Sequence, residues 1–91
     1  MNPNDYVWVK FTERGDELVT QHYAGINARH TARMLRSGRV PSAAFERPQP
    51  GPHGYIKAQF HDVMHWLNGE WRGLGCDILI LDMQLKEPKP T

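Results

Sequence analysis

Two histidines stand four residues apart in the segment HDVMH, which runs from His61 to His65. Residues i and i+4 share one face of a helix, so the two imidazoles could chelate a zinc ion. Asp62 occupies the place where zinc proteases carry a glutamate base, but its side chain is shorter. Residues that could approach as a third ligand are His53, Cys76 and Asp77. We interpret the pair as two surface histidines without a metal, with a zinc-dependent hydrolase as the weaker alternative.

Nucleophilic and cofactor chemistry have little support in the sequence. Cys76 is the single cysteine, so the chain can form no internal disulfide, and no neighbouring motif would lower the pKa of its thiol. The glycines of GEWRGLG match neither a phosphate-binding loop nor a dinucleotide fingerprint. We therefore expect a protein that is not an enzyme and that has no cofactor.

An arginine-rich stretch is the stronger candidate for function. Residues 27–47 contain five arginines and one acid, whereas residues 61–85 contain four acids and one arginine, so the charge is polarised along the chain. The arginines are Arg29, Arg33, Arg36, Arg39 and Arg47. Their guanidinium groups suit either an acidic protein surface or nucleic-acid phosphates. A solvated helix face without a partner is the plain alternative.

The tryptophans are the second indication of binding. Trp66 is expected at the edge of a helix, and Trp71 lies in a glycine-flanked loop next to Arg72. Tryptophan and arginine are enriched among interface residues that carry most of the binding energy. In a small domain, however, tryptophans more often fill the core. Trp8 is expected on the less apolar face of a strand, where a second copy of the chain could bury it in a homodimer.

The first half of the chain predicts a strand followed by two helices. Alternation predicts a strand over residues 6–11, with Val7, Val9 and Phe11 inward. Thr12 caps a helix expected to end near Ala24, before Gly25. Gly15 on its buried side indicates close approach to the strand beneath. A second helix is expected over residues 28–37, ended by Gly38, with Ala28, Thr31, Ala32 and Leu35 inward.

The second half of the chain predicts the core. Five apolar residues share one helical stripe over residues 56–67: Ile56, Phe60, Val63, Met64 and Leu67. Residues 77–85 predict a strand that is covered on both faces at one end. Between these halves, residues 40–45 are expected to form a short edge strand and residues 46–53 a proline-stiffened loop.

These elements predict an α+β fold. We expect a small antiparallel sheet of two or three strands, with two or three helices on one face and the first and last strands as neighbours. Residues 1–85 should form one domain and residues 86–91 a disordered tail. The chain has 91 residues and a formal net charge of +1, and it contains no apolar run long enough to span a membrane. With one cysteine and no leader sequence, a cytoplasmic protein without membrane contact is expected.

The pattern F-T-x-x-G followed by G-Y-x-x-x-Q-F-x-x-x-M resembles small proteins of bacteriophages and prophages. The matching residues are Thr12, Gly15, Gly54, Tyr55, Gln59, Phe60 and Met64. The resemblance covers the first 18 residues and residues 54–85, and leaves the arginine-rich middle unmatched. His61 stands where an aromatic residue is usual, which weakens a metal role for it. The resemblance implies an accessory protein that binds and blocks a host protein, as anti-CRISPR and other anti-defence proteins do.

The sequence therefore favours stoichiometric binding to a host macromolecule, with inhibition by steric occlusion. A host protein is the preferred partner, and a nucleic-acid-binding regulator is the alternative. The residues expected to contact the partner are Arg29, Arg33, Arg36, Arg39, Trp66, Trp71 and Arg72.

Overall fold

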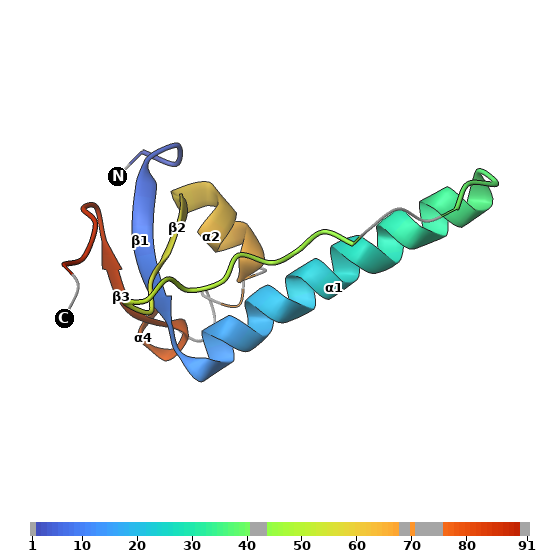
Figure 1. Ribbon diagram of the computed structural model, residues 1–91. Coiled ribbons are helices and arrows are strands. Elements are labelled where there is room, and N and C mark those ends of the chain that lie inside the picture. The colour runs from blue at the N-terminus through green and yellow to red at the C-terminus, as the bar shows by residue number, and fades with distance from the viewer. Residues whose placement is uncertain (1, 41–43, 68–69, 71–75, 90–91) are drawn as a thin grey trace.

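A computed structural model describes residues 2–40, 44–67, 70 and 76–89 of the chain (Figure 1). It has an α+β fold, as the sequence predicts. The elements in chain order are β1 (Tyr6–Phe11), α1 (Glu13–Arg36), β2 (Ile56–Gln59), α2 (Phe60–Trp66), α4 (Cys76–Leu79) and β3 (Ile80–Gln84). Among the helices described, none combines the length and apolar character that crossing a bilayer requires.

The three strands form one antiparallel sheet in the order β2-β1-β3, so the first and last strands are neighbours, as expected. On β1, Val7 and Val9 are fully buried while Tyr6 and Lys10 are exposed, which confirms the predicted alternation. The inward strand residues join helix residues such as Leu18 and Val63 in a single hydrophobic cluster. The core therefore lies between one face of the sheet and the helices.

Helix α1 begins where the sequence places it. The Thr12 hydroxyl accepts a hydrogen bond from the backbone N–H of Gly15 at 3.1 Å, as an N-cap residue does. A Cβ on Gly15 would lie 2.0 Å from the backbone oxygen of Leu79, so the close approach is real. The neighbour is the last residue of α4, directly before β3.

The expected break at Gly25 is wrong, because α1 continues without interruption to Arg36. Glycine inside a helix costs about 1 kcal/mol relative to alanine. Hydrogen bonds on both sides of Gly25 maintain the helix despite that cost. Ser37 is the C-cap of the helix, and Gly38 follows in the left-handed region with φ of 75°, so the second predicted stop is confirmed.

The segment predicted as one helix over residues 56–67 divides into strand β2 and helix α2. Residues Ile56 and Ala58 point inward and Lys57 is exposed, which is the two-residue period of a strand pairing with β1. Ile56 fits both the helical period of the predicted stripe and the two-residue period of a strand. The sequence pattern therefore did not distinguish the strand from a first turn of helix. The burial of Ile56, Val63 and Leu67 was nevertheless predicted correctly.

The closing strand is also shorter than predicted. Residues 76–79 form the single turn α4, and β3 begins at Ile80. Within the predicted apolar run, Leu79 and Ile80 are buried but Ile78 and Leu81 are exposed. The register shifts beside Leu81, since Lys10 pairs with Asp82 while Phe11 pairs with Ile80. This irregularity turns the Leu81 side chain away from the core.

The proline-rich middle has no regular structure where it is described. Residues 46–53 form a loop, as predicted, and residues 40, 44 and 45 are not part of a strand. The rest of the expected edge strand, residues 41–43, lies outside the described residues. In the tail, residues 86–89 belong to no helix or strand.

Candidate interaction surface

The distal half of α1 projects from the body of the protein as an arm, which we define as residues 26–39 (Figure 1). The buried residues of α1, Gly15, Leu18 and Val19, all lie in its first two turns. Leu35 is 61% exposed, and Ala28, Thr31 and Ala32 are exposed as well. The prediction that these four residues form a buried inner side is therefore wrong. A helix of 24 residues is about 36 Å long and extends beyond the core of so small a domain.

The arm carries the arginines on one face. Leu18 and His22 face the body of the protein, and Arg29, Arg33 and Arg36 continue the same face at spacings of three, four and seven residues. All three arginines are exposed, as is Arg39 just beyond the helix. The side of α1 that contacts the core at its base thus becomes a basic stripe where the core ends.

Residues 44–47, which we call the return segment, support the arm on the side opposite the arginines. The Asn27 side chain donates to the Phe45 carbonyl at 3.0 Å and accepts from the Phe45 N–H at 2.7 Å. Phe45 also contacts the His30 ring, with centroids 5.2 Å apart. These contacts fix the return segment along the middle of the helix.

Arg47 has a structural role, although the sequence groups it with the basic stretch. Its side chain is only 14% exposed and forms an ion pair with the Asp16 carboxylate at 2.8 Å. It also donates to the Thr20 hydroxyl at 2.9 Å. The four remaining arginines of that stretch are therefore the ones available to a partner.

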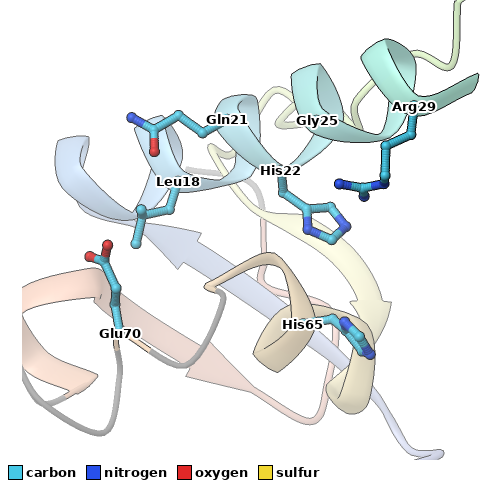
Figure 2. A pocket seen from close by; sticks show the side chains of 7 residues that line it. All are labelled: Leu18, Gln21, His22, Gly25, Arg29, His65 and Glu70. Carbon is cyan, nitrogen blue, oxygen red and sulfur yellow. The ribbon is translucent and has the colours of Figure 1, made fainter. Parts of the chain in front are cut away.

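A groove of about 480 Å³ lies between the base of the arm and α2 (Figure 2). Its lining residues are Leu18, Gln21, His22, Gly25, Arg29, His65 and Glu70. The rings of His22 and His65 lie edge to face, with centroids 6.3 Å apart and planes inclined at 60°. The Arg29 side chain, two helical turns after His22, extends toward His22 (Figure 2). Two imidazoles and a guanidinium group therefore converge at the corner where the arm leaves the body.

The convergence of like charges affects His22. Partial burial lowers its pKa below the ordinary value of 6.5, and the neighbouring His65 and Arg29 lower it further. The carboxylate of Glu70, which also lines the groove, is bound to Arg14 at 3.0 Å and 3.3 Å. The lowered pKa favours neutral His22, so the Arg29 guanidinium is the cation that the corner offers to a negatively charged group of a partner, with imidazole N–H groups as further donors.

The tryptophans predicted to contact a partner are not found on the described surface. Trp66 is 7% exposed and packs among Phe11 and Tyr23 in the core, so its assignment to the partner surface is wrong. Trp66 faces inward because it lies three residues after Val63 on the buried face of α2, whereas Ile56, used to define the predicted stripe, belongs to β2. Trp71 and Arg72 lie outside the described residues.

The histidine pair of α2 does not gather further ligands where the chain is described. The two ring nitrogens of His61 lie 3.1 Å from the Pro3 carbonyl and 3.2 Å from the Asp62 carboxylate. His65 faces His22 instead. Within the described residues, no group of three or more histidine, cysteine, aspartate or glutamate side chains could hold a metal ion. The side chains of Cys76 and Asp77 are not among those described.

Sequence reasoning missed the groove because it divided α1 at Gly25. His22 and Arg29 are seven residues apart, which places them on one face only if the helix is continuous. His65 comes from a different element and could be paired with His22 only by the tertiary structure. Comparison with family models, with curated proteins and with solved structures gave no match.

Proposed function

We propose that this protein works by stoichiometric binding, and that its arm and the adjoining groove hold an acidic surface of a partner protein. The observation that carries the proposal is that the distal half of α1 has no buried residue and exposes its arginines and Leu35. Helices in proteins gain most of their stability from tertiary packing. The projecting half of α1 packs little against the described residues, so a partner surface that packs against it would stabilise it.

An acidic protein fits the arm better than nucleic acid does. Leu35 and Val40 are both more than half exposed and stand beside the arginines, and apolar side chains find pockets on proteins. The arginines would guide the encounter, and the apolar residues would add affinity.

The role of such binding is occlusion. A partner surface bound between the arm and α2 would be covered by this chain of 91 residues. Other molecules could then not reach that surface. In keeping with the resemblance to phage accessory proteins, the partner would be a host protein whose activity is inhibited or redirected. No catalytic group of this chain is required for that role.

The test is affinity capture from a bacterial lysate, with and without nuclease, using the wild-type chain and the double variant Arg33→Ala/Arg36→Ala. The expected result is one protein captured near stoichiometrically despite nuclease and lost with the double variant. Lys86→Ala is the matched control, since Lys86 is exposed and lies away from the arm. Circular dichroism would confirm that both variants fold.

Two results would overturn the proposal. Capture that disappears with nuclease and also with the double variant would assign the arginines to nucleic acid, the alternative function. Capture that survives the double variant would place the protein partner on another surface.

A further inference from the structure

The outer face of the sheet, turned away from the helices, combines aromatic rings with lysines. It is defined by Tyr6, Trp8, Lys10, Tyr55, Lys57 and Gln84. On β1, Tyr6 is 55% exposed, Trp8 is half-buried and Lys10 is exposed. Strand pairing aligns Lys57 of β2 and Gln84 of β3 on either side of Trp8. The face therefore has an aromatic centre with polar and cationic side chains around it.

The lysines lie directly against the rings. The Lys57 ammonium is 5.2 Å from the centroid of Tyr6 and 5.5 Å from that of Trp8. The Lys10 ammonium is 5.8 Å from the centroid of Tyr55. Such cation–π contacts are weak at exposed sites, so a phosphate can attract the lysines away and leave the ring faces open.

A hollow of about 310 Å³ lies at the end of this face, lined by Lys10, His53, Tyr55, Gln84, Pro88 and Lys89. The His53 ring stands edge-on to both Trp8 and Tyr55, with centroids 5.6 Å apart in each case, and so links the aromatic centre to the hollow. Lys10 and Lys89 place two ammonium groups at its wall. The hollow thus offers an aromatic ring and cations together.

The carboxylate of Asp82 also lies on this face and is held in its ionised form by its neighbours. It accepts hydrogen bonds from the Tyr55 hydroxyl and from the Gln84 amide, the latter at 2.7 Å. The hydrogen bond from Tyr55 holds the pKa of Asp82 below its usual value, with further contributions from Gln84 and Lys10. Asp82 therefore fixes the Tyr55 ring in place. Its single negative charge is outnumbered by the ammonium groups of Lys10, Lys57 and Lys89, so the net charge of the face is positive.

We propose that the outer face binds single-stranded nucleic acid, with bases stacked on Tyr6 and Trp8 and phosphates contacted by Lys10 and Lys57. Alternate residues of a strand stand about 7 Å apart on one face, so the two rings can receive successive bases. Stacking on aromatic side chains within a positively charged surface is how proteins bind single strands without reading their sequence. Duplex bases do not expose their faces, so a duplex would bind less well.

A second copy of the chain is a poorer occupant for the same face. Across a two-fold axis the face would meet itself, and the lysines of both copies would be brought into one interface. The centres of homodimer interfaces are depleted in charged residues. Charge complementarity therefore favours a polyanion.

The experiment uses the full chain and fluorescein-labelled oligothymidylate and oligouridylate of about 15 nucleotides, within the range of single-strand site sizes. Fluorescence anisotropy at low salt should show binding, with a matching duplex bound more weakly. Comparing the two oligomers decides whether DNA or RNA is preferred. Trp8→Leu should weaken binding about tenfold, because one stacked base is lost. Lys57→Ala should reduce the slope of log affinity against log salt by about one phosphate contact.

Tyr6→Ala provides a second stacking variant that keeps the fold, since Tyr6 is mostly exposed. Phe45→Ala is the matched aromatic control, because Phe45 is exposed on the return segment of the arm. It should leave the affinity unchanged. Undetectable binding, or binding unaffected by Trp8→Leu and Tyr6→Ala, would overturn the inference.

Two further outcomes would also overturn it. Affinity that is lost with Arg33→Ala/Arg36→Ala and kept with Trp8→Leu would place the oligonucleotide on the arm. A wild-type dimer that becomes a monomer with Trp8→Leu, measured by light scattering, would assign the face to self-association.

Discussion

At the scale of single residues, the joint between α1 and the sheet depends on Gly15. The Leu79 carbonyl passes so close to this helix that it accepts the backbone N–H of Thr12 at 3.0 Å and leaves no room for a side chain. The Thr12 hydroxyl also donates to the Ile78 carbonyl. The start of α1 is therefore fixed to the end of α4 by backbone atoms, and the direction of the arm follows from that joint.

Replacement of Gly15 by alanine should destabilise the fold by roughly 1–3 kcal/mol or more, since the new methyl group would overlap the Leu79 carbonyl. Gly25→Ala is the matched control. A Cβ there would meet only the flexible Arg29 side chain at 3.4 Å, so this change should stabilise the helix by about 1 kcal/mol. Urea denaturation measures both free energies of unfolding. Equal effects of the two substitutions would contradict the close approach.

The pKa of His22 makes a prediction about pH. A histidine whose pKa is lower in the folded state than its unfolded value of 6.5 binds fewer protons when folded. The destabilising effect of His22 on the fold is therefore absent well above pH 6.5, grows as the pH falls through 6.5 and is complete below the folded-state pKa of His22. Denaturation midpoints between pH 8 and pH 5, roughly the range in which histidines titrate, should fall less for His22→Gln than for the wild type.

Gln21→Ala is the control for this pH series, since Gln21 lines the same groove and carries no titratable group. It should preserve the wild-type loss of stability on acidification. A series in which His22→Gln and the wild type lose the same stability would show that the groove does not lower the pKa of His22.

At the scale of elements, support for α1 differs along its length. Its first two turns pack on the core and its middle is held by the Asn27 contacts with Phe45, whereas among the described residues its end is held by helical hydrogen bonds and the terminal turn at Gly38. Local stability should therefore decrease along α1, because helices in proteins depend on tertiary packing.

Hydrogen exchange measures this gradient. We expect the amides of residues 28–36 to exchange faster than those of residues 16–23. Asn27→Ala should remove the protection of the Phe45 amide, which donates to the Asn27 side chain at 2.7 Å. Gln21→Ala, an exposed change on the same helix, should leave Phe45 protected. Uniform protection along α1 would show that the distal half has a support other than the one described.

At the scale of the whole molecule, the arm makes a small domain elongated. The principal extents are 48 × 30 × 26 Å and the Cα radius of gyration is 15.1 Å. A compact chain of this length would have a radius of gyration of about 12 Å. The excess arises from the half of α1 that no core covers. It gives the arm and the outer face of the sheet enough separation to serve different partners.

Small-angle X-ray scattering should therefore give a radius of gyration close to 15 Å in solution. Light scattering on the same sample must give the mass of one chain, because a dimer would also be larger. A monomer with a radius of gyration of about 12 Å would mean that the arm folds back onto the body. In that case the basic stripe would not be free to bind.

The sequence by itself determined which residues are buried on β1, where α1 begins, and that an antiparallel sheet packs with helices. Alternation and capping are local signals, so Val7, Val9, Thr12 and Gly38 could be assigned from their neighbours alone. It also identified the arginines of the arm. Alternation, capping and local charge depend on residues that are close together in the chain, so a short segment is enough to specify them.

Only the tertiary structure decided the length of α1, the strand at Ile56 and the burial of Trp66. Gly25 is a local signal for a break, but its weak cost is exceeded by the helical hydrogen bonds on either side. Ile56 satisfies both helical and strand periods, and pairing with β1 selected the strand. The groove joins His22 and His65 from elements far apart in the chain, and the outer face joins residues of three strands. Such sites depend on strand register and helix continuity, which no short segment contains.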